Sequence, residues 1–216
     1  MQSSVYKQFA LRMLSGNWGI SLLAVVATML VQAVITTQLD LESTDPSVLF
    51  VSIGLLYAAT VLLAPLELGR NWVFLDIAKA EKPSFGLLFD AFGSLKDYVR
   101  AVTYYAIFYV GLNVLMLFLI VPGVWFYLTY RMVPFVLRDQ PELSAFQAMR
   151  ESQRLMRGHK RTMLRLYASF IGWYVLVMFT GGLAYIFVQP YISTALAGLY
   201  LEIKAQTDAS EQPVGS

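Results

Sequence analysis

The chain has 216 residues, of which 57% are hydrophobic and 14% are charged, and its formal net charge is +2. Soluble domains average about 25% charged residues, so this composition excludes an ordinary soluble protein and indicates a membrane protein. The absence of cysteine excludes disulfides and thiolate chemistry, and the single histidine, His159, argues against His-rich metal sites. We therefore expect neither a metal nor a cofactor.

Apolar stretches long enough to cross a membrane recur along the chain. A helix needs about 20 apolar residues to cross about 30 Å of hydrocarbon. The stretches predict an all-α, polytopic helical membrane protein with about six transmembrane helices: 18–39, 47–66, 101–121, 124–137, 162–179 and 183–203. The first is too long for a cleaved signal peptide, so we expect it to stay in the bilayer. Residues 1–203 thus form a single membrane domain, and 204–216 a disordered cytoplasmic tail.

The positions of lysine and arginine orient these spans. With the N-terminus inside, six spans place 15 of the 16 basic residues on the cytoplasmic side, whereas the first outer loop carries Asp40, Glu42 and Asp45. This asymmetry follows the positive-inside rule. We therefore predict a multi-pass protein of a plasma membrane with its N- and C-termini in the cytoplasm.

The fourth stretch is unusual because it is short and contains Arg131 and Pro134. A central arginine costs about 2.5–3.5 kcal/mol to insert, and proline removes a helix hydrogen bond. We infer that spans three and four form a hairpin around Pro122 and Gly123, which either crosses the membrane or is re-entrant. Arg131 is the basic residue that the topology does not explain. A partner carboxylate, a lipid phosphate or a water-filled cavity would account for it.

Both cytoplasmic linkers are predicted to contain interfacial helices, the first starting at Pro83 and Ser84. In the second, Ser144 begins a capping-box pattern and Gly158 is the expected C-cap. Ser84 and Ser144 lie sixty positions apart in matching linkers, which predicts a parallel internal repeat. The apolar helix faces would lie either in the acyl boundary or against span ends. The residues expected to contact anionic lipid headgroups are Arg150, Arg154, Arg157, Lys160 and Arg161.

Ionisable residues at membrane depth are candidates for function because they are costly to bury there. Glu67 lies three residues before Arg70, so the two can pair on one helix face, either to end a span or as part of a site. No catalytic motif is present, and no catalytic residue is predicted. The candidate polar residues are Glu67, Arg70, Arg131 and Asp139.

The segment 131–152, which reads RMVPFVLRDQPELSAFQAMRES, resembles a bacterial integral-membrane family known as domain of unknown function nine-seven-five. The segments 65–69, 121–123, 155–160, 169–173 and 190–191 share this resemblance. The chain also looks distantly similar to the membrane domain of some glycerophosphodiester phosphodiesterases. The resemblance implies a bacterial plasma (inner) membrane protein and supplies no catalytic residues. The recurring family positions are mostly turn, cap or packing types, which favours a shared scaffold: Glu67, Gly69, Pro122, Gly123, Pro134, Asp139, Ser152, Gly158, Gly172, Trp173, Pro190 and Tyr191.

Three functions are open from the sequence. The leading one is a non-enzymatic scaffold or accessory subunit that contacts anionic lipid or a partner protein. The alternative is a transporter of a small molecule or lipid, or a component of one, with a polar site near Arg131 and a sixth span interrupted by Pro190. The third is an enzyme acting on lipid headgroups, which would need Glu67, Asp76 or Asp139. The expected partners are membrane lipids, anionic at the cytoplasmic face, and a protein, but no nucleic acid.

Overall fold

The computed structural model describes residues 2–211, and every regular element in this range is a helix. This confirms the all-α prediction. The helices are α1 (Gln2–Leu14), α2 (Trp18–Thr37), α3 (Pro46–Leu62), α4 (Ala64–Ala78), α5 (Leu87–Asp90), α6 (Leu95–Phe118), α7 (Ile120–Tyr130), α8 (Val133–Asp139), α9 (Ala145–Leu155), α10 (Lys160–Ala168), α11 (Ile171–Phe179) and α12 (Tyr185–Glu211).

Five helical stretches of this region are long and apolar enough to cross a membrane, and α3 with α4 forms a sixth that is bent by 46°. The prediction of about six spans is therefore confirmed. The bend follows from Pro65, whose missing N–H leaves the helix hydrogen bond to the carbonyl four residues earlier unmade. The bend matters because it separates a lipid-exposed helix, α3, from a helix that is buried along its length, α4.

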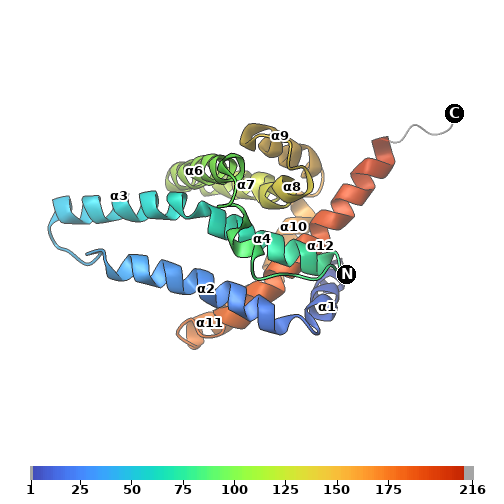
Figure 1. The fold of residues 1–216 in the computed structure, drawn as a ribbon, viewed down its shortest axis with the longest axis horizontal. Helices are drawn as coiled ribbons and strands as arrows, with labels where there is room; N and C mark the ends of the chain where they lie inside the picture. Colours follow the sequence, from blue (N-terminus) through green and yellow to red (C-terminus); the bar gives the residue numbers. More distant parts are fainter. Residues whose placement is uncertain (1, 212–216) are drawn as a thin grey trace.

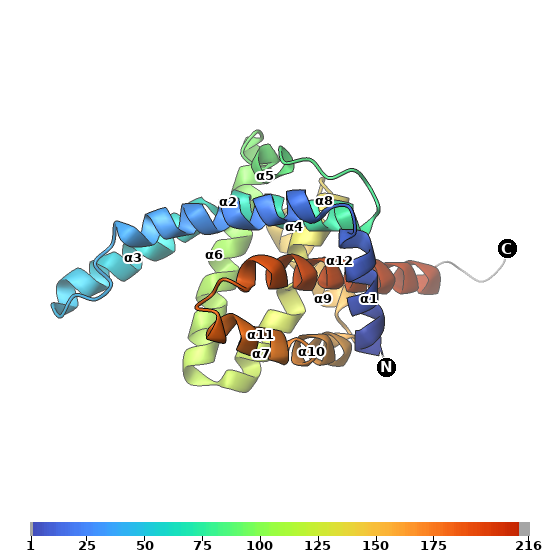
Figure 2. The same ribbon diagram turned by 90° about the horizontal axis from the view of Figure 1, so that it is seen from below.

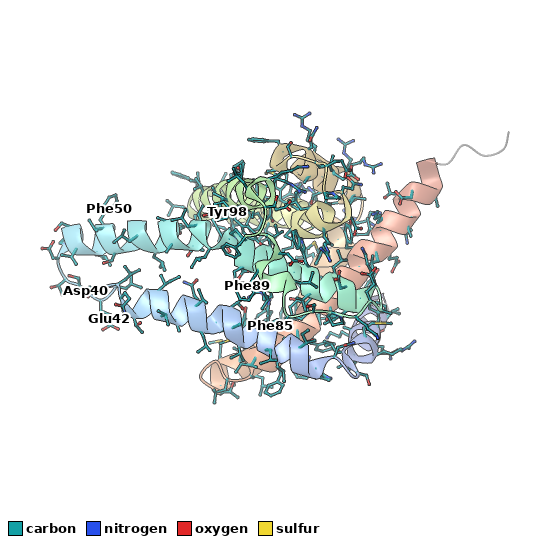
Figure 3. All side chains as sticks on the ribbon, in the orientation of Figure 1. Asp40, Glu42, Phe50, Phe85, Phe89 and Tyr98 are labelled. Atoms are coloured by element: carbon teal, nitrogen blue, oxygen red, sulfur yellow. The ribbon has the colours of Figure 1, made fainter. Side chains whose placement is uncertain are left out.

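The α2–α3 hairpin projects from the body of the molecule, and α1 and the end of α12 lie on the side opposite its tip (Figures 1 and 2). Most of its exposed side chains are apolar; Phe50 is 80% exposed and Val34 is 62% exposed. Such a surface is suited to lipid rather than water. Asp40 and Glu42 lie at the tip (Figure 3), which is the only part of the hairpin that carries charge.

The N-terminus of α3 is held by a polar cap in this acidic tip. Asp45 accepts hydrogen bonds from the Ser47 hydroxyl at 2.7 Å and the Ser47 backbone N–H at 2.8 Å. These bonds stabilise the charged carboxylate and lower its pKa below the ordinary value. The acidic outer loop therefore has a local structural role as a helix cap.

The turn between the third and fourth spans differs from the prediction. It lies at Leu119, whose backbone is extended, and Pro122 and Gly123 belong to the first turn of α7. A Cβ on Gly123 would lie 2.7 Å from the Met116 sulfur, so this glycine allows α7 to approach α6 closely. The fourth span is also longer than expected because it begins at Ile120 and continues through α8.

The direction of the α6–α7 hairpin bears on how it meets the membrane. In Figure 2 it runs across α2, α3 and α12, and in Figure 1 α6 is correspondingly foreshortened. These segments therefore do not share one axis. The hairpin tip is apolar and exposed, with Phe118 at 75% and Val121 at 77%. Both arms of the hairpin, α6 and the α7–α8 segment, are long and apolar enough to cross a membrane.

The two linkers differ in size. The helix expected from Pro83 is a single turn, α5, because the chain around it forms turns, and Phe85 and Phe89 stay exposed (Figure 3). The second linker forms the predicted capping box between Ser144 and Gln147 and a helix of 11 residues, α9. The apolar face of α9 is buried against the protein, not left for the acyl boundary.

Gly158 and the C-terminal segment also refine the predicted boundaries. The C-cap of α9 is Met156, and Gly158 follows with a φ of +83°, which favours glycine over other residues. Helix α12 passes through Pro190 without ending and continues to Glu211. Residues 204–211 are therefore helical and not a disordered tail, while 212–216 lie outside the described residues.

Helix α4 packs along the α7–α8 segment, and the parallel repeat stays a prediction. Side chains of the two segments meet at sequence separations of 60 or 62, and the partners advance together along the chain. The two segments therefore run side by side in the same direction, as parallel copies would. The pairs are Asn71–Arg131, Trp72–Pro134, Asp76–Arg138 and Lys79–Asp139.

Candidate functional site

The bend at the start of α4 places Glu67 and Arg70 in the interior. Their side chains pair at 2.5 Å, as their spacing predicts, and Arg70 also donates to the Thr28 hydroxyl at 3.1 Å. Thr28 lies near the middle of α2, so this contact is far from either end of that span. The pair is therefore at membrane depth and does not mark the exit of a span.

Arg131 lies at the break between α7 and α8, where Pro134 cannot donate to the carbonyl of Tyr130. That carbonyl accepts instead from the Tyr104 hydroxyl at 2.9 Å, and the Ser152 hydroxyl donates to the neighbouring carbonyl of Thr129 at 2.7 Å. The break is thus stabilised by side chains from two other helices. It positions the Arg131 side chain toward α4 instead of along α7.

A cavity of about 280 Å³ lies between α4, α6, α7 and the start of α12. At liquid density this volume corresponds to about nine water molecules. We call it the tyrosine cavity because half of its lining residues are tyrosines. It is lined by Glu67, Arg70, Tyr104, Tyr105, Phe108, Tyr109, Leu112, Tyr127, Arg131 and Tyr185.

The partners of Arg131 are neutral. One guanidinium nitrogen lies 3.4 Å from the Asn71 side-chain oxygen, and the Tyr167 hydroxyl is another polar neighbour. Among residues 2–211, no carboxylate lies within 4.0 Å of this guanidinium, whereas Arg70 is paired with Glu67. The cavity therefore carries two guanidinium groups and one carboxylate, a surplus of one positive charge.

Several tyrosine hydroxyls around the cavity are already engaged. Tyr105 accepts from Asn71 at 3.3 Å, and Tyr127 shares a 2.8 Å hydrogen bond with Tyr167. The side chains of Tyr109 and Tyr185 make no hydrogen bond to the described residues, so their hydroxyls are available to a ligand in the cavity. Phenol donors next to an uncompensated guanidinium suit a carboxylate or phosphate oxygen.

The tyrosines were not singled out from the sequence, although a signal existed. Tyr104, Tyr105, Phe108 and Tyr109 follow helical spacing on α6, and their rings pack in succession at centroid distances of 4.7–5.9 Å. Such a stripe also occurs in ordinary helix packing. Only the position of Arg131 beside it distinguishes a polar site from a core face.

Asp139, the fourth candidate, lies outside this cavity. Its carboxylate accepts from Lys79 at 2.6 Å, Lys204 at 2.7 Å and the Tyr200 hydroxyl at 3.0 Å. We call these four residues the Asp139 cluster. It joins α4, α8 and α12 near the end of the bundle that carries the C-terminal helix, and its side chains satisfy one another.

The carboxylates considered for headgroup chemistry do not converge on one pocket. Glu67 pairs with Arg70, Asp76 with Arg138 at 3.2 Å, and Asp139 with two lysines. Among them, Glu67 alone lines the tyrosine cavity. Each carboxylate therefore stabilises a neighbouring cation.

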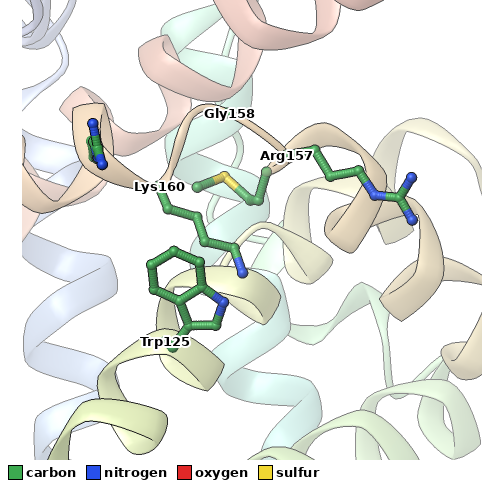
Figure 4. Close-up of a pocket in the computed structure, with 6 residues that line it drawn as sticks. Trp125, Arg157, Gly158 and Lys160 are labelled. Carbon is green, nitrogen blue, oxygen red and sulfur yellow. The ribbon is translucent and has the colours of Figure 1, made fainter.

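The predicted headgroup-binding residues lie on α9, α10 and the turn between them. Arg150, Arg157 and Arg161 are exposed, while Arg154 pairs with Glu151 at 2.6 Å. Lys160 is partly buried and lies over the Trp125 ring, 4.1 Å from its centroid (Figure 4). These cations form a surface that is separate from the tyrosine cavity.

The residues that the sequence predicted to pack between helices or to form turns have different surroundings in the structure. Tyr191 packs edge-on against Phe170 and Trp173, next to Pro190. A Cβ on Gly172 would meet nothing within 4 Å, so this glycine makes no close helix contact. By contrast, a Cβ on Gly69 would lie 2.5 Å from the Leu87 carbonyl oxygen, which shows that α4 and α5 touch through their backbones.

The comparisons with known proteins support these observations at the level of the family. Residues 104–207 match the model of the family described as Protein of unknown function (DUF975), and this segment contains Tyr104, Arg131, Asp139 and the basic residues of α9 and α10. No curated protein and no solved structure matches the chain. The apolar helices make it a multi-pass membrane protein. The match agrees with the family inferred from the sequence motifs: residues 104–207 of the chain are similar to the DUF975 family.

Proposed function

We propose that this protein binds a small anionic solute in the tyrosine cavity and acts as a transporter or as a component of one. The observation that carries this proposal is Arg131, a guanidinium with neutral partners beside a cavity at membrane depth. A carboxylate capping Arg131 would have favoured a purely structural role. Intramembrane cations without a protein counter-ion are characteristic of substrate and ion sites.

The arrangement suggests how a solute would be held. Arg131 would supply charge and paired donors, and Tyr109 and Tyr185 would supply hydroxyl donors. Arg70 is already neutralised by Glu67 and would contribute less. The break at Pro134 supports this role, because transporter sites commonly form at discontinuous helices.

Thermal unfolding of the full chain in neutral detergent tests the proposal. We expect at least one salt from a panel of sodium phosphate, acetate and succinate to raise the Tm relative to sodium chloride at equal ionic strength. The Arg131→Met variant should lose this shift, whereas Arg12→Met, which removes an exposed arginine from α1, should keep it. Uptake of the stabilising anion into proteoliposomes would then separate transport from static binding. A panel without any selective shift, or a shift retained in Arg131→Met, would contradict the proposal.

A second candidate is a scaffold or accessory subunit at the inner face of a bacterial plasma membrane, with both termini cytoplasmic. The exposed arginines of α9 and α10 favour it, because they form a basic surface suited to anionic lipid or to an acidic partner protein. Isolation of the tagged full chain from native membranes, followed by analysis of its lipids and proteins, tests this role. Recovery of the chain with neither a specific lipid nor a partner would contradict it.

A further inference from the structure

Two surface grooves meet at Trp125, on the side of the molecule where α7 packs beside α10. One groove, of about 300 Å³, has an almost wholly apolar lining that includes Val124, Leu128 and Leu164. The other, of about 480 Å³, has a mostly apolar lining that includes Leu115, Pro122 and Phe126, and it also contacts Thr129, Tyr130 and Gln153. Both grooves also contain Val121, Trp125 and Lys160, so they share one end.

A basic pocket of about 450 Å³ adjoins this shared end. Arg157, Lys160 and Arg161 contribute its charge, and Trp125 forms part of its wall (Figure 4). Gly158 lies between these cations with open space around its Cα, so the backbone does not obstruct the pocket. None of the three cations makes an ion pair within residues 2–211.

We infer that this junction, the Trp125 site, binds one anionic phospholipid of the surrounding bilayer. Its phosphate would lie among Arg157, Lys160 and Arg161, and its two acyl chains would occupy the two grooves. Trp125 separates the chains and is fixed by Lys160 above its ring. This inference specifies the lipid contact of the second candidate function, and it does not depend on the tyrosine cavity.

The combination of features favours a membrane lipid over a soluble phosphate or a peptide. A soluble phosphate would use the basic pocket but would leave both apolar grooves empty. The grooves continue toward the tip of the α6–α7 hairpin, where Ile120 and Val121 are 71% and 77% exposed and already require an apolar surrounding. A cluster of cations next to one apolar and one mostly apolar groove matches the polarity of an anionic phospholipid.

The test is native mass spectrometry of the full chain incubated with equimolar phosphatidylglycerol and phosphatidylcholine in detergent micelles. We expect one preferentially retained phosphatidylglycerol. Arg157→Gln/Arg161→Gln should lower this preference roughly thirty-fold, since each cation near an anionic headgroup contributes about 1 kcal/mol. Arg12→Gln/Lys82→Gln removes the same charge from exposed positions outside α9 and α10 and should keep the preference. Glycerol phosphate should not displace the lipid.

Fluorescence locates the same lipid at Trp125. In phosphatidylcholine nanodiscs, brominated phosphatidylglycerol should quench the wild-type chain more than brominated phosphatidylcholine does, and Trp125→Phe should remove that difference. Three other tryptophans remain to report the fold in this variant. Equal retention of both lipids by the wild type, or equal losses in the two charge variants, would overturn the inference. Displacement by glycerol phosphate would assign the pocket to a soluble anion instead.

Discussion

Arg131 and Asp139 lie eight positions apart on the α7–α8 segment, yet their surroundings are opposite. Asp139 is almost fully buried and accepts from two lysines and a tyrosine, which join α4, α8 and α12. Arg131 lies beside a cavity and has neutral partners. Asp139 has its partners within the protein and holds helices together. The Arg131 guanidinium, by contrast, can still donate hydrogen bonds to a bound solute. Four substitutions test this contrast, in order of their expected effect on stability.

Removal of the Asp139 carboxylate should have the largest effect. Asp139→Ala leaves Lys79 and Lys204 close together and the Tyr200 hydroxyl unpaired. We expect the free energy of unfolding to fall by about 3 kcal/mol, because breaking a buried ionic contact from one side leaves uncompensated charge. Denaturant titration in micelles followed by circular dichroism measures this loss. Glu151→Ala, which breaks a more exposed pair within α9, should cost less than about 1 kcal/mol, and equal losses would remove the distinction.

Arg100 extends the comparison to an arginine whose role is structural. Arg100 is 5% exposed. It donates to the carbonyl of Leu137 in the last turn of α8 at 3.1 Å and to the carbonyl of Pro141, just beyond α8, at 2.9 Å. We expect Arg100→Met to lower the free energy of unfolding by about 2 kcal/mol, because these carbonyls lose a charged donor. Lys96→Met, an exposed change one turn earlier, is the control, and the same titration applies. Equal stability of the two variants would contradict the capping role.

Tyr104 connects the wall of the cavity with the break in the fourth span. Tyr104→Phe removes the hydroxyl that donates to the Tyr130 carbonyl, so we expect a loss of about 1 kcal/mol. Tyr98→Phe removes a hydrogen bond to the Leu62 carbonyl at a more exposed position and should cost less. Hydrogen exchange of the α8 amides reports whether the break loosens. Unchanged exchange in Tyr104→Phe would show that the Tyr104 hydroxyl does not stabilise the break.

Arg131 should show the smallest effect on stability. Arg131→Met removes a cation that has no carboxylate partner among the described residues, so we expect a change within about 0.5 kcal/mol, or a gain, because the cost of burying the charge disappears. Unfolding in micelles without added anions measures this change. A loss above about 2 kcal/mol would place Arg131 in the same structural class as Arg100 and would weaken the solute-site proposal.

The sequence was informative wherever a pattern is local. The six apolar stretches, the capping box at Ser144 and the spacing of Glu67 and Arg70 all predicted features that the structure contains. The errors arose where neighbouring helices decide the outcome. The turn lies at Leu119, with Gly123 packed against Met116, and α5 is a single turn whose backbone packs on Gly69.

The candidate site likewise combines a feature that the sequence predicts with contacts that only the tertiary structure shows. Sequence alone identified Arg131 as the charge that topology does not explain, because the cost of a cation in an apolar stretch depends only on the residue and its surroundings in the chain. It left open whether a carboxylate, a phosphate or a cavity accounts for that charge. The answer depended on which side chains of α4, α6 and α12 approach α7, and no local pattern encodes those contacts.

The composition, the apolar spans and the placement of charge were therefore determined by the sequence, since transfer of each residue into hydrocarbon is nearly additive along a helix. Tertiary structure decided the rest. Asp139 became a structural anchor because Lys79 and Lys204 reach it from other helices. Arg131 became a candidate solute site because the carboxylate that could have paired with it, Glu67, pairs with Arg70 instead.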